Sequence, residues 1–201
     1  KTILIKINDY KFGRFKREMG SSVKVYVSKL EIGPKGPFIM LSRSHYGFIK
    51  RLLEIEIPEL SDGTIMLYSV ARDAGSRSKI AVYTEYTNVD PIGAVIGEKG
   101  RRIANVLKEL SGEKIDVILY DKDPVKFIAN ALSPAKDVKV SIKDETKKEA
   151  LALVNDKNLS LAIGKKGQNV KLASRLTHYK IEVKPEEQEN TETTEETSVE
   201  E

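Results

Sequence analysis

The chain contains the stretch DPIGAVIGEKGRRIANVLKELSGEKIDVI (90–118), and a later stretch, KNLSLAIGKKGQNVKLASRLTHYKIEV (157–183), repeats its pattern. The two glycines of GEKG (97–100) match those of GKKG (164–167) at an offset of 67 residues. The closing segments KIDV and KIEV match at an offset of 66, so one residue is deleted between helix and strand. These matches indicate two tandem copies of one small unit.

Both copies predict the same order of elements, read from apolar periodicity and from cap and turn residues. The first copy predicts strands at 65–70 and 79–84, a helix from Asp90-Pro91, the GEKG loop, a helix ending at Ser111-Gly112, and a strand at 114–120. The second copy predicts a helix from Asp123-Pro124, strands at 137–142 and 149–154, a helix from Asn158, the GKKG loop, a helix to Thr177, and a strand at 179–184.

The glycine pair in each loop has a physical use. Glycines remove side chains where a sugar–phosphate backbone must approach the main chain closely. Each loop also leads into the N-terminus of a helix, where unpaired N–H groups favour an anion. A GXXG loop between two short helices is the layout of a KH domain, which clamps about four nucleotides of single-stranded nucleic acid. A single such loop is weak evidence, but two in the same frame predict tandem KH domains.

The loops differ in charge. Glu98 would repel a phosphate in the first loop unless the following arginines outweigh it, so the second loop should bind a backbone more strongly. Gln168 and Asn169 could reach base edges, or could be ordinary polar residues of a helix start. The candidate RNA-binding residues are Gly97, Glu98, Lys99, Gly100, Arg101 and Arg102 in the first copy, and Gly164, Lys165, Lys166, Gly167, Gln168, Asn169 and Lys171 in the second.

A predicted hairpin in ARDAGSRSKIAV (71–82) carries three more cations, Arg72, Arg77 and Lys79, around Gly75. Such a turn could add phosphate contacts. The alternative is a basic hairpin that is simply solvated.

Upstream of the repeat, four short strands with glycine-containing turns predict a small barrel or sandwich. An OB barrel needs five strands, so one would precede Lys1. A helix within residues 42–60 places Phe48, Leu52 and Ile55 on one face and ends at Pro58. The predicted strands lie at 2–7, 10–15, 23–30 and 37–41.

The fold class is therefore α+β: a partial OB-type barrel followed by two KH domains. The predicted domains are the barrel (1–43), the first KH domain with its linker helix (44–122), the second KH domain (123–184) and a disordered acidic tail (185–201).

Composition excludes several functions. The 201 residues include no cysteine and two histidines, which rules out disulfides, a thiol nucleophile and multi-histidine or cysteine metal sites. We expect no cofactor. No apolar run is long enough to span a membrane, and the start KTILIKINDY has no signal-peptide layout, so a cytoplasmic protein is expected. Because the chain begins with lysine, we expect a fragment of a longer protein.

Charge is distributed unevenly along the chain. Eight glutamates and no basic residue follow Lys184. Without them, 34 basic residues face 22 acidic ones, so residues 1–184 carry a net charge of +12 against +4 for the whole chain. A basic body of this kind fits a nucleic-acid partner, although a lysine-rich solvated surface would give the same count. The tail is too polar and too uniformly charged to fold.

The order of barrel, KH and KH resembles the RNA-binding part of the bacterial transcription termination/antitermination factor family, NusA. The phrases that carry this resemblance are GPKGPFIMLSRSH (33–45), ARDAGSRSKIAV (71–82), DPIGAVIGEKG (90–100), GEKIDVILYD (112–121), NALSPAKDVKV (130–140) and LSLAIGKKGQNVKLASRLT (159–177). The resemblance implies a ribosomal S-one-type barrel, KH domains of the bacterial type II arrangement, and GXXG loops that clamp RNA.

The resemblance also implies a non-enzymatic, monomeric protein that contacts the nascent single-stranded transcript. Its other partners would be RNA polymerase and further antitermination factors, and it would modulate pausing, termination and antitermination. The family's polymerase-binding domain would precede the barrel and lies outside this sequence.

Two alternatives remain open from the sequence. An RNA-processing enzyme such as polynucleotide phosphorylase also combines KH and S-one-type domains, but there the KH domain comes first, and no carboxylate cluster for two metals is evident here. A ribosomal or ribosome-assembly KH protein is the other alternative.

Overall fold

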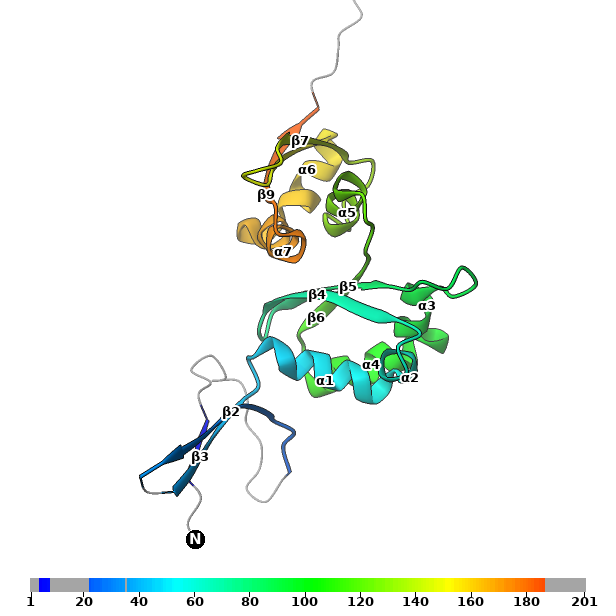
Figure 1. The fold of residues 1–201 in the computed structure, drawn as a ribbon. Helices are drawn as coiled ribbons and strands as arrows, with labels where there is room; N and C mark the ends of the chain where they lie inside the picture. Colours follow the sequence, from blue (N-terminus) through cyan, green and yellow to red (C-terminus); the bar gives the residue numbers. More distant parts are fainter. Residues whose placement is uncertain (1–3, 8–21, 35, 187–201) are drawn as a thin grey trace, which may run out of the picture.

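The computed structural model describes residues 4–7, 22–34 and 36–186, which form three separate three-stranded sheets (Figure 1). Among these residues, no helix has the length and apolar character that crossing a membrane requires. The chain is built in α+β fashion, with helices packed against the two sheets of the repeat.

The first repeat unit is a sheet of strand order β4-β5-β6 covered on one face by helices. β4 and β5 are antiparallel, and β5 and β6 are parallel. This strand pair ahead of the GXXG helices is the expected type II arrangement. The elements are α1 (Tyr46–Glu56), α2 (Pro58–Ser61), β4 (Met66–Asp73), β5 (Arg77–Tyr83), α3 (Pro91–Ile96), the 3-10 turn η1 (Glu98–Gly100), α4 (Arg101–Glu109) and β6 (Lys114–Leu119).

The second unit repeats this topology with strand order β7-β8-β9. Here too the first pair is antiparallel and the second is parallel. Its elements are α5 (Pro124–Ala131), β7 (Lys139–Asp144), β8 (Glu149–Val154), α6 (Asp156–Ile163), η2 (Lys165–Gly167), α7 (Gln168–Thr177) and β9 (Lys180–Pro185).

Caps set the helix starts as the sequence indicates, with one difference. The carboxylates of Asp90 and Asp123 accept hydrogen bonds from Ile92 N and Val125 N, which confirms both predicted cap–proline starts. The helix predicted from Asn158 instead begins at Asp156. Asn155 caps it, and its Oδ1 accepts a hydrogen bond from the backbone N–H of Asn158 at 2.9 Å.

The N-terminal sheet has the order β1-β3-β2, formed by β1 (Leu4–Ile7), β2 (Tyr26–Gly33) and β3 (Gly36–Ser42). β1 runs parallel to β3, whereas β2 is antiparallel to it. The described residues do not show a closed OB barrel, and the strand predicted at 10–15 lies outside them. Most of the predicted tail also lies outside them, but Pro185 still belongs to β9, and Glu186 N donates to Val154 O.

Helix α1 buries a different stripe from the one predicted. Phe48 and Leu52 are buried as expected, but Ile55 is 66% exposed, so that assignment is wrong. The stripe includes Ile49 and Leu53, both fully buried. At about 100° per residue, Ile55 lies about a quarter-turn from the centre of this stripe.

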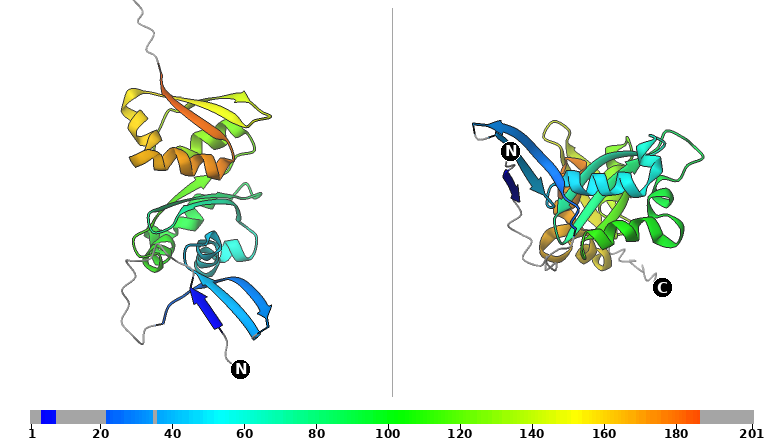
Figure 2. Two further views of the ribbon diagram at one scale, coloured as in Figure 1. Left: turned by 90° about the vertical axis from the view of Figure 1, so that its left-hand side faces the viewer. Right: turned by 90° about the horizontal axis from the view of Figure 1, so that it is seen from below.

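The two KH units pack through a shared core. One face of the first sheet holds Ile80 and Val82 against its own helices, while Ala81 on the opposite face joins the core of α5 and α7. Sheet and helix layers therefore alternate along the molecule, and the side view shows the same stacking (Figure 2). Small residues in the shared core allow α7 to lie between the two sheets: Ala71, Ala81, Ala131, Ala150, Ala152 and Ala173.

Candidate nucleic-acid interface

The two GXXG loops have the same backbone conformation. Their first glycines, Gly97 and Gly164, have φ and ψ of 73° and 173°, and 73° and 171°. The third residues are left-handed, with φ of 53° at Lys99 and 54° at Lys166. The first position lies in a φ/ψ region that essentially only glycine occupies. The repeat seen in the sequence is thus also a repeat in backbone conformation.

Within each loop the two glycines have different surroundings. A Cβ on Gly97 would lie 2.6 Å from Arg102 Cγ, and one on Gly164 would lie 2.7 Å from Asn169 Cβ. A Cβ on Gly100 would have no neighbour within 4 Å, and one on Gly167 would have only a lysine side chain at 3.7 Å. The first glycine therefore allows the loop to pack on its own helix, whereas the second leaves the main chain open to solvent.

We expect Gly164→Ala to destabilise the protein by roughly 3 kcal/mol, because strained backbone costs about 1–3 kcal/mol and the new Cβ would also meet backbone atoms of Asn169. Gly167→Ala should cost only about 1–2 kcal/mol, the penalty of a left-handed residue in open space. Urea unfolding of the two variants measures the difference. Equal losses would show that packing on Asn169 does not hold the first glycine in place.

Free cations gather at the loops. Lys99, Arg101, Lys165 and Lys166 are exposed, and no ion pair involves them in the described part of the chain. Glu98 is exposed beside them at the rim of a hollow of about 430 Å³ in front of the first loop. Each loop also precedes a helix of nine or ten residues, so unpaired N–H groups and the helix dipole add to the positive potential there.

Arg102, a further candidate, lines the same hollow but is held by contacts within the protein. Its Nη1 contacts both carboxylate oxygens of Glu59 at 3.0 Å and donates to Ala94 O at 2.8 Å. Its stem covers Gly97. The side chain thus ties the first loop to α2.

The hairpin cations lie in ion pairs within the protein. The Arg72 side chain is almost fully buried and forms a bidentate ion pair with Glu113. Its Nε and Nη2 each donate to one carboxylate oxygen at 2.9 Å. Arg77 forms the same type of contact with Asp116, at 2.8 and 2.9 Å. Both side chains are therefore held at the sheet by carboxylates, although Arg72 also lines a hollow together with Lys165 and Lys166 of the second loop.

Lys79 links the two KH units. It is fully buried, and its Nζ donates to Asp116 Oδ2 at 3.0 Å and to Ser133 O of the second unit at 2.7 Å. Burial lowers the pKa of the ammonium, and the Asp116 carboxylate opposes that shift.

Gln168 and Asn169, the two candidates for base contacts, also bind within the protein. Asn169 is buried, and its Nδ2 lies 3.0–3.1 Å from three carbonyl oxygens, including that of Leu132. Gln168 Nε2 lies 2.8 Å from both Asp73 Oδ2 and Ser76 Oγ of the first unit. Lys171 remains exposed one turn into α7.

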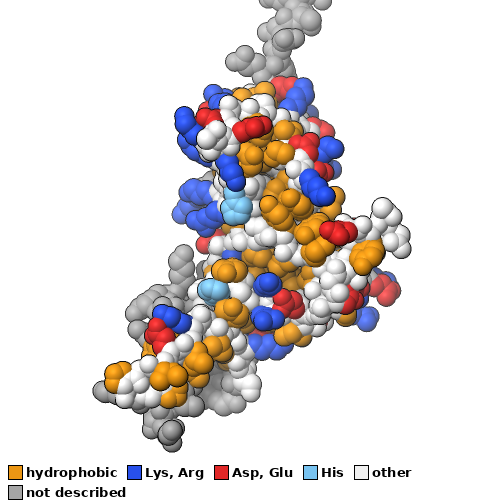
Figure 3. All heavy atoms as spheres, viewed as in Figure 1, with side chains coloured by type: hydrophobic (Ala, Val, Ile, Leu, Met, Phe, Trp, Pro, Cys, Tyr) orange, Lys and Arg blue, Asp and Glu red, His pale blue; other side chains and the backbone are white. Residues whose placement is uncertain are grey.

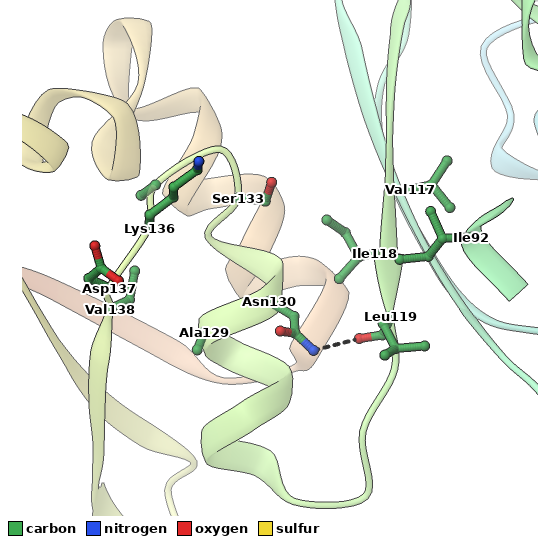
Figure 4. Close-up of a pocket in the computed structure, with 11 residues that line it drawn as sticks. Ile92, Val117, Ile118, Leu119, Ala129, Asn130, Ser133, Lys136, Asp137 and Val138 are labelled. Carbon is green, nitrogen blue, oxygen red and sulfur yellow. Dashed lines mark hydrogen bonds between the residues drawn. The ribbon is translucent and has the colours of Figure 1, made fainter. Parts of the chain in front are cut away.

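A hollow between the two units was not foreseen from the sequence. It measures about 680 Å³ and is lined by α3 and β6 of the first unit and by α5 and the following loop of the second (Figure 4). Asn130 Nδ2 donates to Leu119 O across it at 3.0 Å. Its walls are mostly apolar, with Lys136 and Asp137 at one side. Because each unit supplies only part of it, no local sequence pattern could reveal it.

Comparison with known proteins gives the same domain order. Residues 43–120 match the model of the NusA-like first KH domain, and residues 124–191 match that of the NusA-like second KH domain. The chain belongs to the NusA family. Proteins named transcription termination/antitermination protein NusA are 53% identical over 164 residues in Halalkalibacterium halodurans and 52% identical over 164 residues in Bacillus subtilis. The Mycobacterium tuberculosis protein of that name is 49% identical over 167 residues.

These NusA matches cover 82–83% of this chain but only 43–48% of the relatives. The chain thus spans less than half the length of the NusA proteins that it matches. Both GXXG loops lie inside the matched KH regions.

Proposed function

We propose that this chain is the RNA-binding part of a transcription termination/antitermination factor and that it holds single-stranded RNA on its two GXXG loops. The observation that carries the proposal is the pair of loops with one backbone conformation. Each presents an open glycine main chain and exposed cations that form no ion pair with the residues that the structure describes. We assign the clamp to two loop segments: Gly97, Glu98, Lys99, Gly100 and Arg101, and Gly164, Lys165, Lys166 and Gly167.

The internal contacts of the other candidates support a different role for them. Arg72, Arg77, Lys79, Arg102 and Asn169 hold the loops and the two units in place through ion pairs and carbonyl contacts. Each has at least one polar group held in such a contact, so RNA binding through that group would require breaking it.

The hollow between the units supports a path for the strand. It lies beside α3, the helix that leads to the first loop, and its apolar floor could receive bases while the backbone follows the loops (Figure 4). Because the shared core and Lys79 fix the spacing of the two loops, they can act on one continuous strand.

The wider role follows from the family. We propose that the protein acts in the cytoplasm on the nascent transcript, as a monomer and without catalysis, together with RNA polymerase and other antitermination factors. It would modulate pausing, termination and antitermination. We further propose that the N-terminal sheet belongs to an OB-type barrel of the S-one type (1–43) ahead of KH domains at 44–122 and 123–184.

A fluorescence-anisotropy titration with a single-stranded RNA of roughly 12 nucleotides tests the proposal, since each KH loop clamps about four. We expect submicromolar to micromolar binding whose logarithm falls with the logarithm of salt concentration by about 0.7 per phosphate neutralised. A duplex of the same sequence is the control and should bind more weakly. Equal binding of duplex and single strand, or no binding of either, would contradict the proposed function.

A further inference from the structure

Another hollow lies beside the GKKG loop. It measures about 680 Å³ and is enclosed by the β4–β5 turn, by Ser44 before α1 and by one face of α7. This size is within the range of about 300–1,000 Å³ that is usual for ligand sites. We call it the hairpin hollow; its polar lining includes Asp73, Ser76, Lys165, Lys166, Lys171 and Arg175.

Helix α7 presents a regular polar face to the hairpin hollow. Gln168, Lys171 and Arg175 are spaced i, i+3 and i+7, so they lie on one side of the helix. The amide of Gln168 is held by Asp73 Oδ2 and Ser76 Oγ, both at 2.8 Å. These two contacts fix the turn against the start of α7 and give the hollow a defined wall.

Most of the positive charge in the hairpin hollow is uncompensated; Arg72, which also lines it, is paired with Glu113. Lys165, Lys166, Lys171 and Arg175 are exposed, and in the ranges that the structure describes none of them forms an ion pair. The lining contains one acid, Asp73, and its Oδ2 already accepts from Gln168. Basic side chains gather beside α7 on the molecular surface (Figure 3). Four cations facing one hollow favour a polyanion.

We propose that the hairpin hollow binds phosphodiesters of the RNA just beyond the GKKG loop and leads the strand toward the N-terminal sheet. Two loop lysines form its rim, so a backbone held at Gly167 passes directly into it. Ser44, two residues after the end of β3, marks the side where the N-terminal sheet lies. The inference rests on the proposed function, because it extends the same RNA strand.

Three RNAs and one double variant test the inference. A short RNA of roughly eight nucleotides is sufficient for the two loops, and the long RNAs carry about six more at either the 5′ or the 3′ end. We expect one long RNA to bind wild type about tenfold more tightly than the short one. In Lys171→Gln/Arg175→Gln this gain should disappear and the salt slope for that RNA should fall by about 1.4, two phosphates at about 0.7 each. Binding of the short RNA should weaken far less, by no more than the one phosphate that Lys171 could reach beside Gly167, a slope change of about 0.7.

The matched control is Lys147→Gln/Lys148→Gln, which removes the same charge at the β7–β8 turn. That turn lies at the other end of α7, where Lys180 N donates to Lys148 O. This control variant should leave the binding of the short and the long RNAs unchanged. Equal loss with the control and the test variant would overturn the inference, as would no gain from either extension. Either result would leave the proposed function intact as long as wild type binds the short RNA. Failure of wild type to bind the short RNA would contradict the proposed function itself.

Discussion

Aspartates in place of Glu98, Lys99, Lys165 and Lys166 are expected to lower RNA affinity at least about 100-fold at low salt. The second loop changes from two positive to two negative charges, and the first from neutral to two negative charges. The salt slope should also fall by about 0.7 for each phosphate that the protein no longer neutralises. Anisotropy titrations at two salt concentrations measure both quantities.

The fold should survive this substitution. Lys99 and Lys166 have positive φ, and aspartate is among the residues that tolerate that conformation. Negative side chains just before α4 and α7 also suit the helix dipoles. Circular dichroism should therefore show wild-type melting, which makes a loss of binding a property of the surface. Retained affinity in a folded variant would place the RNA elsewhere on the molecule.

A substitution that adds positive charge to the first loop gives a matched control. Glu98→Lys turns GEKG into GKKG, with the same backbone geometry in both loops. Removing the repulsion of a phosphate by Glu98 and adding a cation should raise affinity about threefold to tenfold at low salt and steepen the salt slope by about 0.7. A decrease would mean that Glu98 makes a favourable contact with the RNA.

The repeat made most of the KH architecture predictable. Caps at Asp90 and Asp123 and the strand at 149–154 are local features, because the residues that determine them lie within a few positions. The glycine pairs likewise indicated loops whose dihedral angles prove to match. The N-terminal sheet was less predictable, since the described residues show three strands and no closed barrel.

The roles of the polar and charged side chains could not be predicted from their neighbours in the sequence. Arg72 meets Glu113 across 41 positions, Lys79 meets Ser133 O across 54, and Gln168 meets Asp73 across 95. In the sequence each is a polar residue near a turn or helix start and is compatible with RNA contact. For Arg72 only the folded first unit, and for Lys79 and Gln168 only the packing of one unit on the other, shows that the side chain lies in a contact within the protein.

Glu113→Gln is expected to cost about 3–5 kcal/mol of folding free energy, the usual loss when a buried ion pair keeps one partner. The Glu113 carboxylate is 1% exposed and accepts from two Arg72 nitrogens, from Gly75 N at 3.0 Å and from Ser78 Oγ at 2.5 Å. The amide leaves the guanidinium buried without a counter-charge and turns an N–H₂ group toward other donors. Urea unfolding at neutral pH measures the loss.

A surface pair provides the matched control. Glu149→Gln removes the partner of Lys180, whose side chain is 81% exposed, so the cost should stay below about 1 kcal/mol. A cost for Glu113→Gln as small as this control would mean that the buried pair contributes little.

Glu113→Gln should also change RNA binding. Its bond to Gly75 N fixes the β4–β5 turn, and that turn holds Gln168 at the start of α7 through Asp73 and Ser76. The folded Glu113→Gln protein should therefore lose the tenfold gain from the longer RNA while still binding the short one on its loops. Full retention of that gain would show that the turn keeps its position without the carboxylate, and that the Gln168 contacts alone suffice to hold it.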